Sequence, residues 1–309
     1  MKKHKICKIL LVILAIFLCV AFYELLGICV AYKKQPEVSN TTKKETKNGS
    51  WNECSENTER AVIIEKNPEA LLQRVRLIKN AKKEIILSTF AFQSDESGKL
   101  ILGALHDAAD RGVHIRLLVD GMESWIDMEG NPYFYGLSSH ENVEIKLYNK
   151  ANPLKPWKMM GRMHDKYLIA DGKRYILGGR NTYNYFLGDF PGHKNYDRDV
   201  LVVCDEPEKE NSVNQLLEYF ETIWEQEDSG YFHDNKKLAN RKSVKNAVLE
   251  LQNGYQKYFE ENKERICDTD YTDETFETEK IALVSNPIHT GSKEPVVWYQ
   301  LGELMKNAK

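Results

Sequence analysis

The sequence predicts an α/β domain with a largely parallel sheet covered by helices, preceded by one transmembrane helix. From residue 61 to residue 148, short apolar runs alternate with amphipathic helical segments, and this strand–helix–strand order is typical of parallel sheets. The chain has 309 residues, which is more than a single hydrophobic core usually accommodates, so we expect one large domain or two. A net charge of −3 gives no overall sign of a nucleic-acid binder.

The first element is an apolar segment, Ile9–Tyr32, whose only charge is Glu24. A helix of this length extends about 36 Å, which is enough to cross a bilayer. Four lysines precede it: Lys2, Lys3, Lys5 and Lys8. This basic head should stay in the cytoplasm, so residues 1–34 are expected to form a single-pass anchor that places the rest outside. The competing interpretation is a cleaved signal peptide with Ile9–Tyr23 as its apolar core. Without a convincing small-x-small cleavage site, a retained anchor is favoured.

Residues 35–59 follow, and they are rich in Lys, Asn, Thr, Glu and Ser. This composition predicts a flexible stalk. Of six cysteines in the chain, three belong to the anchor segment, which leaves Cys54, Cys204 and Cys267 outside it. An odd number cannot pair completely within the chain, and no cysteine spacing resembles a zinc site. We expect no metal and no cofactor.

The expected domain, residues 60–267, begins with alternating elements. Periodicity predicts strands at 61–64, 84–92, 113–120 and 143–148, and helices at 67–80, 97–111, 214–225 and 243–266. Asn67-Pro68 is a good cap and first-turn pair for the first of these helices. Residues 121–142 are expected to form a loop-rich segment between two strands. Residues 152–160, which contain Trp157, are expected as a loop that overhangs the functional site.

A predicted β-hairpin follows, and it contains the candidate catalytic residues. Asp171-Gly172, between two apolar runs, is a strong hairpin signal. Strand alternation makes His164 and Lys166 project from the same face. A neutral imidazole can attack phosphorus, and a nearby ammonium can hold the charge of a phosphate.

A Gly-Gly-x-Asn element ends the hairpin. Gly178 and Gly179 would let the backbone approach that phosphate, and the amide of Asn181 can donate to it. Each residue alone is more simply explained as a strand or surface residue. Their joint spacing is what favours a phosphate site.

His-x-Lys-x4-Asp followed by Gly-Gly-x-Asn resembles the HKD signature of the phospholipase D superfamily. The matching residues are His164, Lys166, Asp171, Gly178, Gly179 and Asn181. The resemblance implies an α-β-α sandwich with a mixed, largely parallel sheet. It also implies phosphodiester chemistry without metal, in which one histidine forms a phosphohistidine and a second protonates the leaving alcohol. In this pattern His164 and Lys166 are catalytic, Lys166, Asn181 and Gly179 bind the phosphate, and Asp171 and Gly178 support the motif.

An acid shortly after the Gly-Gly-x-Asn element orients the histidine in the resembled family. Asp197, in the run Asn195-Tyr196-Asp197-Arg198-Asp199, is the closest match, and Asp199 is the reserve. The simpler interpretation is that both acids pair with Arg198 where a strand begins. Lys and Arg are also concentrated between residues 146 and 181, which fits an anionic substrate.

The C-terminal part suggests a second copy of the domain. Residues 268–280 are acidic and are expected as a linker, and Ile281–Val284 is expected as a strand. Leu304–Lys309 then echoes Leu77–Lys82, which indicates an internal repeat. By resemblance, residues 281–309 would be the start of a truncated second phospholipase D-like domain. The second His-x-Lys would come from missing downstream sequence or from another copy of the chain.

Together these features lead us to expect a membrane-anchored, extracytoplasmic phosphodiesterase or phosphatidyltransferase that acts on phospholipid. Cardiolipin-synthase-like chemistry is a serious candidate, although this chain has one apolar N-terminal segment where such enzymes typically have more. The alternatives are an endonuclease of the same superfamily acting as a dimer, and a catalytically silent membrane-bound interaction module. The near-neutral charge and the anchor make nucleic acid the less favoured partner.

Overall fold

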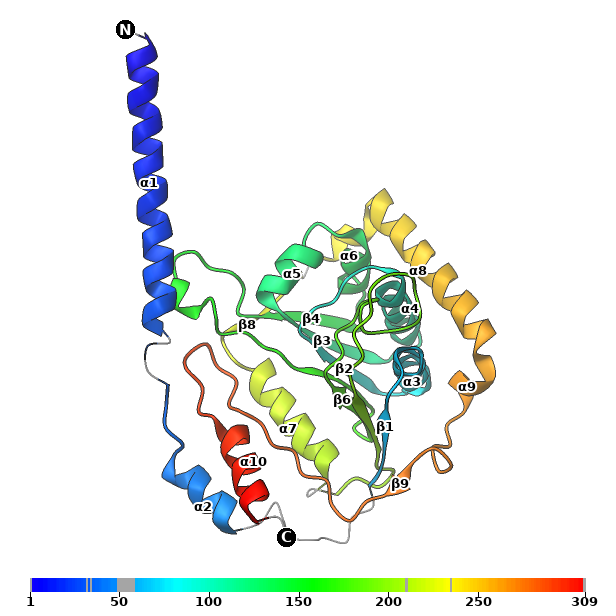
Figure 1. The fold of residues 1–309 in the computed structure, drawn as a ribbon. Coiled ribbons are helices and arrows are strands. Elements are labelled where there is room, and N and C mark those ends of the chain that lie inside the picture. Colours follow the sequence, from blue (N-terminus) through cyan, green and yellow to red (C-terminus); the bar gives the residue numbers. More distant parts are fainter. Residues whose placement is uncertain are drawn as a thin grey trace. The chain divides into compact units, whose positions relative to one another are not determined.

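The computed structural model describes residues 2–31, 33, 35–48, 59–208, 211–233 and 235–307. It divides into two compact units, which are described separately (Figure 1). The larger unit comprises residues 49–150 and 163–283, and the smaller one residues 1–48, 151–162 and 284–309. Cys54 and residues 49–58 of the expected stalk lie outside the described residues.

A mixed sheet forms the centre of the larger unit. In the described residues it has nine strands, in the order β8-β4-β3-β2-β5-β6-β7-β1-β9. The strands are β1 (Arg60–Ile64), β2 (Glu84–Thr89), β3 (His114–Asp120), β4 (Val143–Tyr148), β5 (Lys166–Ala170), β6 (Arg174–Gly178), β7 (Asp199–Val203), β8 (Ser229–Tyr231) and β9 (Phe276–Glu277).

The sheet is mixed, as predicted, but it is not largely parallel. Among these strands only β2–β3 and β3–β4 pair in parallel. The other six neighbouring pairs are antiparallel. Among neighbouring strands, helices connect only β2 to β3 and β3 to β4, whereas the tight turn at Asp171-Gly172 forces β5 and β6 to run antiparallel.

Helices cover both faces of this sheet. Helices α3 (Asn67–Asn80) and α4 (Glu96–Asp110) lie on one face and α7 (Ser212–Trp224) on the other (Figure 1). The core against α3 and α4 takes alternate strand residues, such as Ile85 and Leu87 of β2. Outside α4 packs α8 (Lys242–Glu261), which α9 (Lys263–Cys267) follows, and a 3-10 turn, η2 (Lys236–Asn240), precedes α8.

The region expected to be loop-rich contains two short helices, so that prediction was wrong. These are α5 (Gly121–Asp127) and α6 (Pro132–Ser138). Asp120 Oδ1 accepts from the backbone amides of Met122 and Glu123, at 3.0 and 3.3 Å. Asn131 Oδ1 accepts from Tyr133 N at 3.1 Å, ahead of a proline in the first turn. Both cap residues were visible in the sequence.

The expected linker, residues 268–280, is packed onto the larger unit. The buried guanidinium of Arg76 donates to the carbonyl oxygens of Asp268 and Asp270, at 2.8 and 2.7 Å, and pairs with Glu274 at 2.9 Å. Strand β9 pairs with β1. The strand expected at Ile281–Val284 does not form.

Glu59 belongs to the folded domain rather than to a stalk. It is fully buried, and its Oε1 accepts from Ser212 Oγ at 2.7 Å and from Val213 N at 3.3 Å, at the start of α7. Its carbonyl oxygen accepts from the amide and hydroxyl of Thr278, at 3.1 and 2.8 Å. Within the expected stalk the structure also forms a helix, α2 (Asn40–Asn48).

The smaller unit contains the apolar helix α1 (Lys2–Ala31), the 3-10 turn η1 (Pro156–Lys158), α2 and α10 (Val296–Asn307). The part of α1 from Lys5 to Ala31 has the length and mean hydropathy, 2.9, of a membrane-spanning helix or a signal sequence. Near its C-terminal end the hydroxyl of Tyr23 donates to the carbonyl oxygen of Leu154 at 2.9 Å. Gly27 leaves room for Pro156, because a Cβ there would lie 2.4 Å from the proline ring. The segment 151–162 therefore contacts the last turns of α1.

Candidate active site

His164 and Lys166 meet at the beginning of β5. The Nζ atom of Lys166 lies 2.9 Å from His164 Nδ1 and donates to the His164 carbonyl oxygen at 2.7 Å. Because an ammonium group has no acceptor, Nδ1 accepts, and the proton of the neutral imidazole then sits on Nε2. Lys166 is buried, whereas His164 is exposed. The ring is thus open to a substrate on one side and held by the lysine on the other.

The surroundings of Lys166 weaken its charge. Burial lowers the pKa of Lys166 to about 8, against the opposing effect of the carboxylates of Asp165 and Asp197. Phe90 contributes to this burial, with its ring centre 5.4 Å from Lys166 Nζ and 4.5 Å from the His164 ring. The pairing of Thr89 with Lys166 explains this position, since Phe90 is the next residue after β2. No local pattern in the sequence indicates this contact between distant residues.

Asp197 approaches the second glycine of the Gly-Gly pair. A Cβ on Gly179 would lie 2.0 Å from Asp197 Oδ2, so no other residue fits without displacing the carboxylate. Asp197 Oδ1 also accepts from the backbone amide of Arg198 at 2.7 Å. We expected Gly179 to make room for a phosphate. In the structure the missing side chain makes room for Asp197.

Asp199, the reserve acid, occupies a different environment. It is fully buried and pairs with Arg74 at 2.9 Å and with Arg180 at 3.2 Å. A Cβ on Gly178 would lie 2.0 Å from Asp199 Oδ1. Asp199 is therefore part of a buried ionic cluster. Gly178 packs against Asp199, and Gly179 packs against Asp197.

Arg180, the variable residue of Gly-Gly-x-Asn, connects this cluster to Asp197. Its side chain is fully buried and donates to the carbonyl oxygen of Asp197 and, at 2.7 Å, to that of Glu65. Its Nε also donates to Asn67 Oδ1 at 3.1 Å. Arg180 thus fixes the backbone that carries Asp197. In the sequence Arg180 is only one of many basic residues between positions 146 and 181.

Asn181 is buried at the other side of the hairpin end. Its Oδ1 accepts from Ala91 N at 3.2 Å, which leaves its NH₂ group as the donating side. A parallel bridge between Phe92 and Thr182 holds the two segments together. Burial raises the pKa of the neighbouring Tyr183, and a hydrogen bond with the Asn181 side chain acts in the opposite direction.

Asp171 lies at the far end of β5 from His164. Its carboxylate accepts from the backbone amides of Lys82, Lys83 and Glu84, at 2.9, 2.7 and 3.0 Å. Its backbone has a positive φ of 55°, which the hairpin turn requires. These contacts tie the turn to the loop before β2 and place Asp171 outside the candidate site.

Two further carboxylates position the segment around His164. Asp120 Oδ2 accepts from Met163 N at 3.1 Å, so the residue that ends β3 holds the backbone next to His164. Asp165 Oδ2 accepts from the hydroxyl of Tyr219 on α7 at 2.7 Å. Burial raises the pKa of Tyr219 well above its usual range, and the Asp165 charge adds to the effect. The alternation along β5 predicted the opposite directions of Asp165 and Lys166.

The basic run between residues 146 and 181 does not form one phosphate-binding surface. Lys146 donates to the carbonyl oxygen of Trp224 and Lys173 to that of Asp205. Arg180 is buried, and Arg174 pairs with Asp205 at 2.7 Å. Lys146 lies on β4 and Arg174 on β6, with three strands between them in the sheet, so the clustering of these residues in sequence was a poor guide.

Residues 74–224, close to half of the chain, match the family model described as "Cardiolipin synthase, PLD-like domain". The resemblance to the phospholipase D superfamily is thus confirmed over this part of the chain.

Similar proteins include an uncharacterized protein of Helicobacter pylori strain J99, 30% identical over 64% of this chain and 39% of that protein. Cardiolipin synthase C of Escherichia coli K12 is 29% identical over 51% of this chain and 34% of that protein. A phospholipase D family member, Nuc from Salmonella typhimurium, is similar in structure, with 20% identity and a TM-score of 0.41 over 57% of this chain and 99% of that one. The chain spans about two fifths or less of the curated relatives that it matches.

Proposed function

We propose that this protein is a phospholipase D-type phosphodiesterase or phosphatidyltransferase that acts on phospholipid through a phosphohistidine intermediate. The contact between Lys166 Nζ and His164 Nδ1, at 2.9 Å, carries the proposal. An imidazole and an ammonium group this close together support the proposal, because both can engage the same phosphate. The acid Asp197 influences the charge of Lys166 from nearby.

In the first step, His164 Nε2 attacks phosphorus, a P–N bond forms, and the P–O bond to the leaving alcohol breaks. Attack requires Nε2 to be free of its proton. We propose that the bound phosphate draws the Lys166 ammonium away from Nδ1, so that Nδ1 carries the proton and donates it in a hydrogen bond to Asp197. Asn181 would donate its NH₂ group to a phosphoryl oxygen. Water or an acceptor alcohol then attacks phosphorus, and the P–N bond breaks.

A second general acid is needed on the side of the leaving oxygen, opposite the attacking nitrogen. No other histidine in the sequence is followed two residues later by a lysine. We propose that a second His-x-Lys half completes the site, either from further sequence or from another copy of the chain related by twofold symmetry. The echo of Leu77–Lys82 in Leu304–Lys309 supports the first source.

The smaller unit supports a lipid substrate. The segment 151–162 contacts the end of α1 and leads directly into His164. It exposes Leu154, Trp157 and Met160 beside basic residues, a composition suited to a membrane surface. If α1 is a retained anchor, this segment lies at the interface of the bilayer with water.

The test uses the full chain reconstituted in phosphatidylglycerol vesicles, with a downstream second-motif half supplied where one is encoded. Three substrates are compared: bilayer phospholipid, a water-soluble phosphodiester and double-stranded DNA. We expect turnover of the lipid, an acid-labile phosphoryl-protein, no effect of chelators, and loss of activity to background in His164→Ala. The matched control, His233→Ala, should stay active.

Cleavage of DNA but not of lipid would instead identify an endonuclease. Activity that depends on chelatable metal would contradict the histidine mechanism. If His164→Ala remained folded and active, the proposed nucleophile would be wrong.

A further inference from the structure

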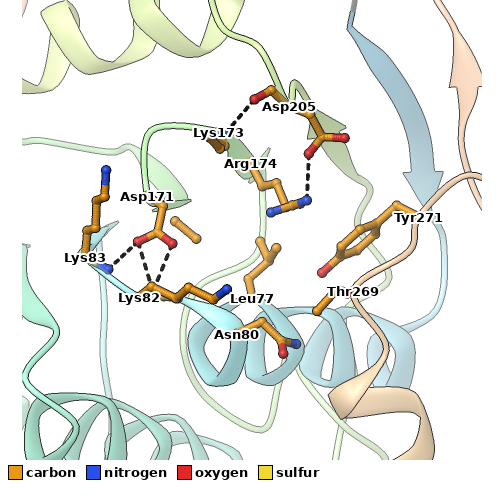
Figure 2. Close-up of a pocket in the computed structure, with 12 residues that line it drawn as sticks. Leu77, Asn80, Lys82, Lys83, Asp171, Lys173, Arg174, Asp205, Thr269 and Tyr271 are labelled. Carbon is orange, nitrogen blue, oxygen red and sulfur yellow. Dashed lines mark hydrogen bonds and ion pairs between the residues drawn. The ribbon is translucent and has the colours of Figure 1, made fainter.

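A second polar cavity lies in the larger unit, away from His164. Its volume is about 410 Å³, and the end of α3, the hairpin turn after β5 and the segment around Tyr271 line it (Figure 2). Strand β5 separates it from the candidate active site, because His164 precedes the strand and Asp171 follows it. Five residues of strand correspond to roughly 17 Å. The cavity is therefore a separate site.

Two buried donors in this cavity have no acceptor among the residues that the structure describes. They are the hydroxyl of Tyr271, a residue that is only 4% exposed, and the Nε atom of Arg174. Figure 2 shows both groups facing the space that they share with Leu77 and Thr269. Buried donors without an acceptor are costly, and two of them in one cavity indicate a missing acceptor.

The charge around these donors is positive. Four basic residues and two acids line the cavity, which leaves a net charge of two positive units. Both acids are already engaged. Asp171 accepts from three backbone amides, and Asp205 pairs with Arg174 at 2.7 Å. The side chain of Lys82 extends toward the cavity in Figure 2, so its ammonium is available to a ligand.

We infer that this cavity binds the phosphoryl group of a small phosphorylated molecule. A phosphate dianion matches the net charge, and its oxygens accept from Tyr271, Arg174 and Lys82 at once. The cavity is larger than a phosphate ion alone requires, so a phosphate ester of a small polar alcohol fits better than inorganic phosphate. The guanidinium of Arg76 lies 3.9 Å from the centre of the Tyr271 ring and so helps to hold this side chain in place.

The experiment is a calorimetric titration of the full chain in detergent, carried out in a Lys166→Gln background to weaken phosphate binding at His164. The probes are inorganic phosphate, glycerol 3-phosphate and, as a neutral control, glycerol. We expect one saturable site that prefers the ester, and no binding of glycerol. Tyr271→Phe removes only the hydroxyl and should weaken binding about tenfold, as expected for a lost hydrogen bond to a charged group.

Lys82→Gln should weaken binding similarly and should also reduce its salt dependence. The matched control is Lys257→Gln, an exposed lysine on α8, which should bind like the parent. Thermal unfolding of each variant separates lost binding from lost folding. Absence of saturable binding, or equal binding by Tyr271→Phe and Lys82→Gln, would overturn the inference. Stronger binding of inorganic phosphate than of the ester would identify free phosphate as the source of the phosphoryl group.

Discussion

At the scale of single residues, both glycines of the Gly-Gly pair make room for aspartates that follow about twenty residues later. Gly178 is thereby coupled to Asp199, and Gly179 to Asp197. The approach of these two loops is a tertiary contact, and it leaves no local pattern in the sequence.

Lys166 should make phosphate binding pH-dependent. Its pKa is lowered to about 8, so the charged fraction falls about tenfold for each pH unit above that value. We expect the affinity for a phosphate inhibitor to fall accordingly between pH 8 and 10. In Lys166→Arg the cation persists, and the decline over this range should largely disappear.

The same group should affect stability in the opposite sense. The folded-state pKa lies below the ordinary 10.5, so the unfolded chain holds more protons between pH 8 and 10.5. Stability should therefore rise with pH across that window, and urea titrations of the parent and of Lys166→Met would measure the difference. Equal slopes for both proteins would show that Lys166 titrates normally.

Gly179→Ala provides a direct test of the contact with Asp197. The added Cβ would lie 2.0 Å from Oδ2, so the carboxylate or the backbone must move, at a cost of about 1–3 kcal/mol. Turnover should fall as well, because Asp197 is displaced. The control is Gly254→Ala on α8, where a Cβ meets nothing within 4 Å and should stabilise the helix by about 0.5–1 kcal/mol. Denaturant unfolding of both variants would decide, and an unperturbed Gly179→Ala would contradict the packing.

At the scale of elements, β7 and α3 are joined by the buried cluster of Asp199 with Arg74 and Arg180. Asp199→Asn leaves two buried guanidinium groups without their carboxylate and should destabilise the protein by about 3–5 kcal/mol. Asp197→Asn keeps the carbonyl oxygen that Arg180 binds, so its stability should change by less than about 1 kcal/mol while its turnover drops. Similar losses of stability in both variants would argue against the separate roles of the two acids.

Most elements were predictable because their signals are local. The turn Asp171-Gly172, the Asn67-Pro68 helix start and the apolar runs of β3 and β4 all placed an element within a few residues of its observed bounds. Strand direction was not predictable in the same way. Strand β1 pairs with β7, about 140 positions later, and nothing in either strand records that partner. The role of Phe90 and Arg180 beside the candidate site was missed for the same reason.

At the scale of the whole molecule, the apolar helix α1 has the length and hydropathy of a membrane anchor or of a signal sequence. We expect a retained anchor with its basic end in the cytoplasm. A reporter enzyme that is active only outside the cytoplasm, fused after Lys34, should be active and should sediment with membranes. A cytoplasmic reporter at the same position is the control and should be silent. A shorter, soluble product would instead identify α1 as a cleaved signal sequence.

The burial of Glu59 has a practical consequence for anyone who separates the domain from the apolar helix α1. A cut after residue 59, the point at which composition suggested that the domain begins, removes the acceptor of the Ser212 hydroxyl and of the Val213 amide. It also removes the carbonyl oxygen that binds Thr278, and so weakens the attachment of the segment at the edge of the sheet. A soluble fragment should therefore start several residues earlier, and one that starts at Arg60 should unfold at a lower temperature.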